Sequence, residues 1–107
     1  MLKILLSGCN GAMGKVITNC VEEREIVAGL DVNTAANGLY PIFGSADDID
    51  VKVDVIIDFS HPSALSGVLK YALSTKTPAV ISTTGLSEEQ INSLQLASSQ
   101  IPIFFSA

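Results

Sequence analysis

The chain has 107 residues, of which 48% are hydrophobic and 16% are charged, enough apolar material for one compact domain with a buried core. Its net charge of −5 argues against a surface that neutralises a phosphate backbone, so no nucleic acid partner is expected. No apolar run approaches the roughly 18 residues of a membrane span, and the apolar start is too short for a signal peptide, so we expect a cytoplasmic protein without a membrane partner.

Apolar runs rich in β-branched residues alternate with amphipathic stretches, which is typical of an α/β fold with helices on both faces of a parallel sheet. The pattern predicts strands at residues 3–7, 25–31, 53–59, 78–81 and 101–105. Between them it predicts helices at residues 12–22, 62–73 and 87–98, and an irregular connection at residues 33–44. We therefore expect about five strands in a doubly wound sheet.

The ends and faces of these helices carry further signals. In the first helix, Val16, Ile17 and Cys20 have the spacing that turns side chains toward a core. In the last helix, Ser87 and Gln90 have the spacing of a capping box, in which a hydroxyl and an amide side chain bond each other's backbone. The second helix begins with Pro62, a residue suited to a first turn.

No metal site is predicted. Cys9 and Cys20 lack a CxxC spacing, and free thiols in a reducing cytoplasm are expected. The acidic cluster of Asp47, Asp48 and Asp50 lacks the spacing of a calcium loop and indicates a solvated turn or short helix.

A glycine-rich segment follows the first predicted strand and opens the first helix. Its residues are Gly8, Cys9, Asn10, Gly11, Ala12, Met13 and Gly14, spaced Gly-x-x-Gly-x-x-Gly instead of the usual Gly-x-Gly-x-x-Gly. Gly8 permits a tight turn, Gly11 lets the backbone approach a pyrophosphate, and Gly14 permits close packing of helix on strand. The free N–H groups of the helix start then face the phosphates. A glycine-rich turn without a ligand is the alternative.

An acidic residue ends the second predicted strand. Asp31 lies 23 residues after Gly8, close to the offset of about 20 at which a carboxylate bonds the adenosine ribose hydroxyls. The two features together indicate a dinucleotide. A carboxylate repels a 2′-phosphate and the following Val32 supplies no cation, so NADH is the expected cofactor, with NADPH possible. A solvated loop carboxylate is the alternative for Asp31.

Small polar residues follow the three later strands, where a bound dinucleotide would pass. They are Ser60 after the third strand, Ser82, Thr83 and Thr84 after the fourth, and Ser106 after the fifth, with the aromatic Phe59 and the small Ala107 beside them. Hydroxyls and exposed amides at such positions can bind ribose or a carboxamide, and an aromatic ring offers a flat wall. An N-cap role explains Ser60 about equally well.

No catalytic residue is assigned. His61 is the single histidine and precedes a helix-starting proline, so we interpret it as a loop residue and not as a general acid. Asp58 is interpreted as a buried, hydrogen-bonding carboxylate at a strand end and not as a base.

These segments together resemble one family, the 4-hydroxy-tetrahydrodipicolinate reductases (dihydrodipicolinate reductases) of lysine and diaminopimelate biosynthesis. The resemblance covers the whole chain. It rests on the glycine segment at 8–14, Val-Ile-Ile-Asp-Phe-Ser at 55–60, Ser-Thr-Thr-Gly at 82–85 and Pro-Ile-Phe-Phe-Ser-Ala at 102–107.

The resemblance implies a Rossmann-like sheet in which residues 8–13 hold the pyrophosphate and Asp31 the adenosine ribose. Residues 82–84 and 106–107 would then hold the nicotinamide. NADPH-accepting members often carry a cation where Ala12 and Val32 stand, so both departures favour NADH. Ser82 stands where the family usually has glycine.

The family continues into a second, sheet-based domain with a His-His-x-x-Lys type motif that binds and protonates the substrate and supplies tetramer contacts. Nothing in residues 1–107 matches that motif. The resemblance thus implies a single truncated cofactor-binding domain of a homotetrameric enzyme, able to bind NAD(P)H but not to reduce a cyclic substrate alone. Two alternatives remain, a non-catalytic NAD(H)-sensing module and another small amino-acid dehydrogenase with the same fold.

Overall fold

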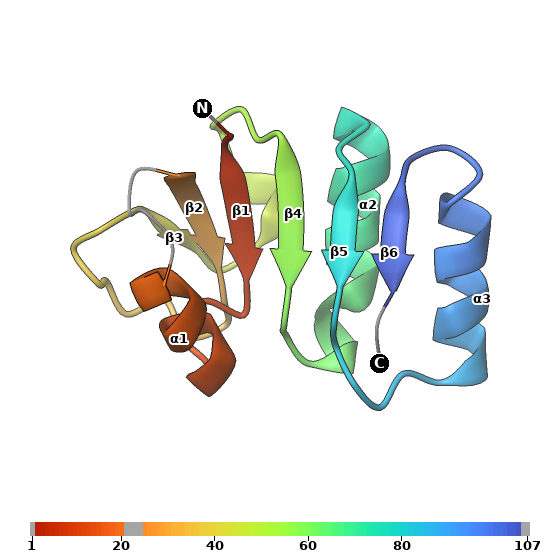
Figure 1. The fold of residues 1–107 in the computed structure, drawn as a ribbon, viewed down its shortest axis with the longest axis horizontal. Helices are drawn as coiled ribbons and strands as arrows, with labels where there is room; N and C mark the ends of the chain where they lie inside the picture. The colour runs from red at the N-terminus through yellow and green to blue at the C-terminus, as the bar shows by residue number, and fades with distance from the viewer. Residues whose placement is uncertain (1, 21–24, 106–107) are drawn as a thin grey trace.

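The structure, a computed structural model, describes residues 2–20 and 25–105. Its centre is a six-stranded sheet whose neighbouring strands are all parallel (Figure 1). The strands are β1 Ile4–Ser7, β2 Ile26–Leu30, β3 Ile42–Phe43, β4 Val55–Asp58, β5 Ala79–Ile81 and β6 Ile103–Phe105. Their order across the sheet is β3-β2-β1-β4-β5-β6, that of a doubly wound Rossmann fold. The predicted fold class is confirmed.

Helices cover both faces of this sheet. They are α1 Ala12–Cys20, α2 Leu65–Thr75 and α3 Glu88–Ala97, with short 3₁₀ helices η2 Ala46–Asp48 and η3 Pro62–Ala64. One buried apolar cluster lies between the sheet and α2 and α3, and a second lies on the opposite face, where Ile17 of α1 packs. The strand order reverses between β1 and β4, and the carboxyl ends of the strands share one edge, drawn lowest in Figure 1. Ligands of such sheets bind at this edge.

Local signals in the sequence set several element ends as predicted. The hydroxyl of Ser87 accepts from the backbone N–H of Gln90 at 3.1 Å, and the Gln90 side chain accepts from the backbone N–H of Ser87 at 3.0 Å. This capping box begins α3. Pro62 lies in the first turn of η3, and the acidic residues of η2 are exposed.

One strand was not predicted. Residues 33–44 were expected to be irregular, but β3 lies within them and pairs with β2, Gly29 opposite Ile42 and Leu30 opposite Phe43. The sheet therefore has one strand more than the five that the sequence pattern predicted. Two residues between a proline and a glycine carry no local strand period, and the pairing with a distant segment forms the strand.

The first helix buries a different face from the predicted one. Val16 is 54% exposed and Cys20 is exposed, whereas Ile17 is partly buried. The buried residues of α1 are Gly14 and Thr18. The expectation that Val16 and Cys20 face the core is therefore wrong. The expected continuation of this helix to residue 22 lies outside the described residues.

Gly14 sets this rotation of α1. A Cβ at this position would lie 2.2 Å from the carbonyl oxygen of Gly8 and 2.7 Å from the backbone of Cys9, so the helix lies directly on the glycine turn. Thr18, one turn later, then faces inward, where its hydroxyl donates to the Gly14 carbonyl at 2.9 Å and lies 2.8 Å from the Tyr40 hydroxyl. The close backbone contact at Gly14, and not the spacing of the apolar residues, therefore determines which face of α1 is buried.

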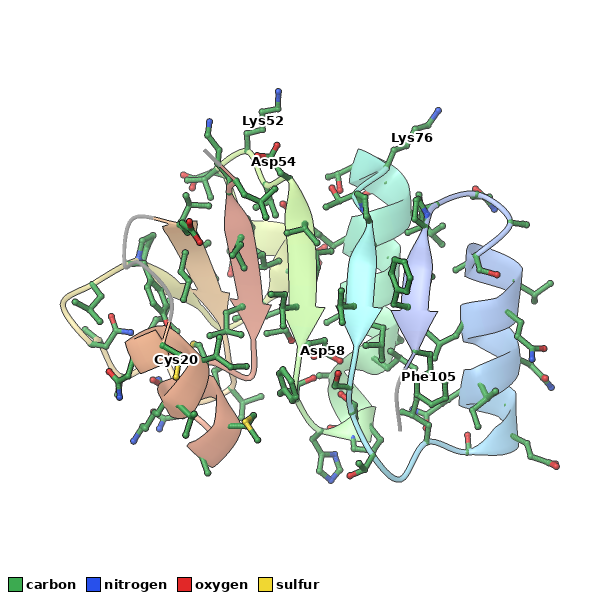
Figure 2. The ribbon with its side chains drawn as sticks, viewed as in Figure 1. Cys20, Lys52, Asp54, Asp58, Lys76 and Phe105 are labelled. Atoms are coloured by element: carbon green, nitrogen blue, oxygen red, sulfur yellow. The ribbon has the colours of Figure 1, made fainter. Side chains whose placement is uncertain are left out.

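Cys9 is buried and Cys20, labelled in Figure 2, is exposed, and both are free thiols as predicted. None of the helices in the described part of the chain is long and apolar enough to cross a membrane. The outer strand β6 leaves Phe104 71% exposed.

Candidate functional site

The glycine turn after β1 requires glycine at its first position. Gly8 has a φ of +84°, a backbone conformation that disfavours other residues. Its N–H donates to the carbonyl of Leu30 at 2.7 Å, and the N–H of Gly11 donates back to its carbonyl at 3.1 Å, closing the turn. A Cβ on Gly8 would lie 2.9 Å from the peptide joining Phe59 and Ser60. The turn is thus fixed against both neighbouring strand ends.

The helix that follows presents its positive end at this turn. Gly11 precedes α1, and a Cβ there would meet nothing nearer than the Gly8 carbonyl oxygen at 3.4 Å. Ala12 and Met13, the first residues of α1, are exposed. The first N–H groups of a helix have no carbonyl partner within it and attract anions. The space beside Gly11 is therefore open to a negatively charged group.

Asp31 follows β2 and ties that strand to the glycine turn. One carboxylate oxygen accepts from the backbone N–H of Asn10 at 3.0 Å, and the other accepts from that of Asn33 at 2.9 Å. The Asn10 side chain donates to the carbonyls of Asn33 at 2.6 Å and Ala35 at 3.0 Å. Each carboxylate oxygen has a second lone pair, so Asp31 can accept further hydrogen bonds from a diol.

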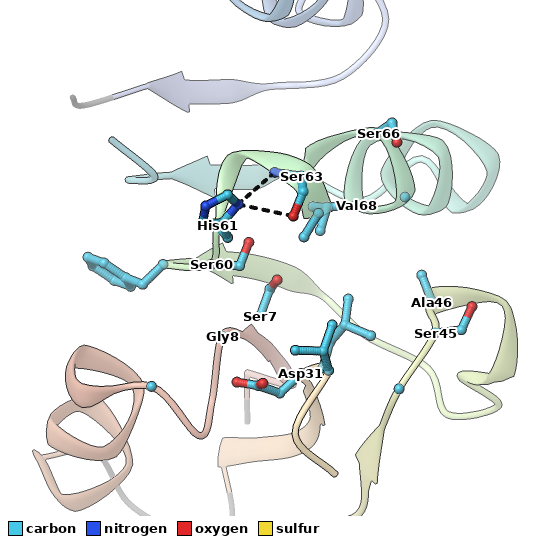
Figure 3. A pocket seen from close by; sticks show the side chains of 17 residues that line it. Ser7, Gly8, Asp31, Ser45, Ala46, Ser60, His61, Ser63, Ser66 and Val68 are labelled. Atoms are coloured by element: carbon cyan, nitrogen blue, oxygen red, sulfur yellow. Dashed lines mark hydrogen bonds between the residues drawn. The ribbon is translucent and has the colours of Figure 1, made fainter. Parts of the chain in front are cut away.

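A cavity of about 650 Å³ opens beside this turn (Figure 3). It lies between the ends of β1 and β2, η2, and the start of α2. Of the predicted site residues, it is lined by Gly8, Gly11, Asp31, Phe59 and Ser60. A volume of this size is in the range of small-molecule sites in proteins.

The other predicted site residues do not line this cavity. Cys9 and Asn10 lie against a smaller hollow on the α1 side, and Ala12 and Met13 lie on α1. Ser82, Thr83 and Thr84 follow β5, with Thr83 buried and Thr84 exposed. Ser106 and Ala107 lie outside the described residues.

The sequence analysis missed much of the cavity wall. The missed residues are Ser7, Leu30, Val32, Gly44, Ser45, Ala46, His61, Ser63, Ala64, Ser66, Gly67 and Val68. Residues 44–46 were missed because β3, the strand that brings them to the binding edge of the sheet, was not predicted. The sequence did contain one signal for the other side of the cavity. Residues 63, 64, 66 and 67 of η3 and α2 are all small, so they leave room for a ligand beside the start of this helix.

The loops after β4 and β5 meet at a buried carboxylate. Asp58, labelled in Figure 2, is 0% exposed at the end of β4. One of its oxygens accepts from the backbone N–H of Ser60 at 3.1 Å and from the Ser60 hydroxyl. The other accepts from the Thr83 hydroxyl at 2.7 Å. The predicted role of Asp58 as a buried hydrogen-bonding carboxylate is confirmed, and the Ser60 and Thr83 hydroxyls are committed to it.

His61 caps η3. Its Nδ1 accepts from the backbone N–H of Ser63 at 3.2 Å and lies 3.0 Å from the Ser63 hydroxyl. The prediction of a loop residue is confirmed, and the alternative that Ser60 is the N-cap is wrong. No group of three or more His, Cys, Asp or Glu side chains gathers as a metal site within residues 2–20 and 25–105.

The Cys9 thiol is a packing group. Its side chain is 1% exposed and lies so close to Gly29 that a Cβ on that glycine would be 2.6 Å from the sulfur. Burial, followed by the nearby charge of Asp31, raises the pKa of the Cys9 thiol to about 11. At neutral pH the raised pKa keeps the group a neutral thiol, which disfavours a role as a nucleophile.

Comparisons with known proteins agree with this geometry. A family model described as dihydrodipicolinate reductase, N-terminus, matches residues 2–107. The 4-hydroxy-tetrahydrodipicolinate reductase of Clostridium tetani is 43% identical over 110 residues, and that of Caldanaerobacter subterraneus is 42% identical over 110 residues. Each match takes in 100% of this chain and 43% of the relative, so the chain spans less than half the length of these relatives.

Solved structures share the fold. A dipicolinate-bound dihydrodipicolinate reductase from Paenisporosarcina sp. TG-14 matches with a TM-score of 0.71 and 26% identity, over 92% of this chain and 43% of that one. The WlbA dehydrogenase of Thermus thermophilus, solved with NAD and UDP-GlcNAcA, matches with a TM-score of 0.71 over 98% of this chain and 41% of that one, but at 18% identity it shows the fold alone. By the family match over residues 2–107, the chain belongs to the dihydrodipicolinate reductases and corresponds to their N-terminal part.

Proposed function

We propose that residues 1–107 bind the nicotinamide dinucleotide of a 4-hydroxy-tetrahydrodipicolinate reductase. The observation that carries this proposal is the convergence of the glycine turn, the Asp31 carboxylate and a cavity of about 650 Å³ at the point where the strand order reverses. The relatives named above are reductases, which favours the enzyme over an NAD(H)-sensing module.

The pyrophosphate would lie beside Gly11, against the first N–H groups of α1. The N–H groups of Gly8, Asn10 and Gly11 are already bonded within the protein, so those of Ala12 and Met13 are the better candidates to hold it. Of the predicted residues 8–13, we therefore assign direct contact with the pyrophosphate to Ala12 and Met13. The other residues of the segment fix the conformation of the turn.

The adenosine half would occupy the cavity. Asp31 lines this cavity and would accept from the ribose hydroxyls while keeping its bonds to the backbone. A 2′-phosphate would meet that carboxylate, and the adjacent Val32 is 93% exposed and uncharged. Both features support a preference for NADH over NADPH.

The nicotinamide half would extend along the ends of β4 and β5. Phe59 offers a flat wall. The backbone N–H of Ser82 is bonded to the Asp58 carbonyl at 2.9 Å, so the Ser82 hydroxyl and the exposed Thr84 are the candidates to bind the carboxamide, with Ser106 and Ala107 as further proposed contacts. Bound NADH supplies a hydride to an unsaturated ring. The residues of this chain bind and orient that cofactor.

The substrate site of the whole reductase is proposed to lie in the length that this chain does not share with its relatives. We place the complete enzyme in the cytoplasm as a homotetramer, in keeping with the family. Its free thiols, Cys9 and Cys20, suit a reducing compartment.

Calorimetric titration with NADH and NADPH tests the proposal, with Gly11→Ala as the decisive variant. A methyl group at this position meets only one backbone oxygen, at 3.4 Å, so the fold should tolerate it, whereas it fills the space proposed for the pyrophosphate. We expect NADH affinity to fall about tenfold or more while the thermal midpoint stays within about 2 °C. Equal affinity in wild type and variant, or no binding by the folded wild type, would count against this function.

A further inference from the structure

One buried side chain in the described cavity wall has no hydrogen-bond partner. Ser7, the last residue of β1, is 1% exposed, and its hydroxyl is a buried polar atom without a donor or acceptor in range among the described residues. Figure 3 shows Ser7 near Asp31, and both residues line the cavity. Buried hydroxyls in folded proteins are bonded in the large majority of cases, so this one calls for a partner.

The neighbouring polar groups do not provide that partner. Ser7 pairs in register with Asp58 of β4, but no hydrogen bond joins the Ser7 hydroxyl to this carboxylate, whose oxygens accept from Ser60 and Thr83. The Ser60 hydroxyl, also in the cavity wall, donates to Asp58. The backbone carbonyl of Ser7 accepts from the backbone N–H of Phe59 at 3.0 Å, so of the polar groups of Ser7 it is the buried hydroxyl that has no bond among the described residues.

The rest of the wall restricts what can lie against Ser7. The described lining contains no Lys or Arg, and it contains the Asp31 carboxylate, so an anion is disfavoured there. Gly67, Val68 and Ala46 supply small or apolar surface on the side of η2 and α2. A flat, neutral, heteroaromatic group with polar atoms at its edge fits this combination.

We propose that the Ser7 hydroxyl is a direct hydrogen-bond partner of the purine base of the bound dinucleotide and contributes to the choice of base. This inference rests on the proposed function. A hydroxyl can donate to a ring nitrogen or accept from an exocyclic amino group, so it can bond either kind of edge atom. In the ligand-free protein the buried hydroxyl lacks a hydrogen bond, which destabilises the fold. A hydrogen bond from the bound base would remove this penalty and so favour binding.

The test is Ser7→Ala, titrated with AMP and with NADH and melted without ligand. AMP carries the base, ribose and one phosphate, so it occupies the proposed subsite without the nicotinamide half. We expect the affinities for AMP and for NADH to fall by a similar factor of about ten, because both share the base. We also expect the ligand-free thermal midpoint to stay level or rise by about 2–6 °C, because an unpaired buried hydroxyl has been removed.

A matched pair separates hydrogen bonding from shape. Ser7→Thr and Ser7→Val add the same bulk, but the first retains the hydroxyl. We expect AMP to bind several times more tightly to Ser7→Thr than to Ser7→Val. Equal affinity in this pair, an unchanged AMP affinity in Ser7→Ala, or a lowered ligand-free midpoint in Ser7→Ala would overturn the inference, the last because it would mean that the hydroxyl already has a partner.

The two proposals fail separately. If the folded wild type binds neither AMP nor NADH, the proposed function fails and this inference fails with it. If the wild type binds both and Ser7→Ala binds them equally well, the dinucleotide site stands and Ser7 has no part in reading the base.

Discussion

Removing the Thr83 hydroxyl measures how much its hydrogen bond to the buried Asp58 carboxylate contributes to the stability of the fold. Thr83 is 2% exposed and its hydroxyl donates to Asp58 at 2.7 Å, across the join between the β4 and β5 loops. Thr83→Val keeps the shape of the side chain and leaves a buried carboxylate oxygen without this donor. Hydrogen bonds to charged groups contribute about 1.5–3 kcal/mol, so we expect a loss of about 2 kcal/mol in the free energy of unfolding. In a domain of this size the thermal midpoint should fall by about 10 °C.

Thr83→Ser is the control for this experiment, because it keeps the hydroxyl and removes one methyl group at a cost of about 1 kcal/mol. Urea denaturation of both variants, with equal slopes as a check on two-state behaviour, gives the difference. The reasoning is refuted if Thr83→Val is as stable as Thr83→Ser. That outcome would mean that Asp58 obtains an equivalent bond elsewhere once the hydroxyl is gone.

Three further predictions concern packing, thiol chemistry and cofactor choice. Gly14→Ala should destabilise the fold by about 3 kcal/mol because its Cβ would lie 2.2 Å from a carbonyl oxygen. Gly67→Ala, which meets nothing within 4 Å in a helix, should stabilise it by about 0.5–1 kcal/mol, and denaturant titration compares the two. At pH 8 iodoacetamide should alkylate the exposed Cys20 long before the buried Cys9. Because the pKa of the Cys9 thiol is raised to about 11, the contribution of this thiol to stability should be lost as pH rises from about 9 to 11. Mass spectrometry locates the label, and a flat stability profile in that pH window would contradict the burial of the thiol. Val32→Arg should raise the ratio of NADPH to NADH affinity about three- to fivefold, while Val32→Gln should leave the ratio unchanged.

The sequence predicted the elements that have their own periodicity or caps. β1, β4, β5 and β6 were predicted within one or two residues at each end, since each is a continuous apolar run. The start of α3 was predicted because Ser87 and Gln90 bond each other's backbone, which is a local interaction.

The errors came from contacts between distant segments. β3 has only two residues, and its partner Gly29 is 13 residues away, so its own sequence contains no sign of it. The rotation of α1 depends on how Gly14 touches the turn before it, and the apolar spacing of Val16 and Cys20 carried no information about that contact.

The site was predicted on one side only. Gly8, Gly11 and Asp31 belong to a motif with fixed spacing, so the sequence singled them out, and all three line the cavity. Ser7 and the opposite wall around Val68 have no such spacing, and they come together because α2 crosses back over the sheet. Thr83 was predicted from its position at a strand end, but the structure shows its hydroxyl bonded to Asp58.

The position of β1 in the middle of the sheet has a consequence for the order in which the protein can be assembled. β1 is made before the other strands of this sheet, but one of its two edges is completed only when β4, Val55–Asp58, is available. At translation rates of about 5–20 residues per second, the Ile4–Ser7 edge waits several seconds on the ribosome with unpaired backbone groups and apolar side chains. We expect this nascent segment to be a binding site for chaperones, and slowing translation before residue 55 should increase aggregation of the product.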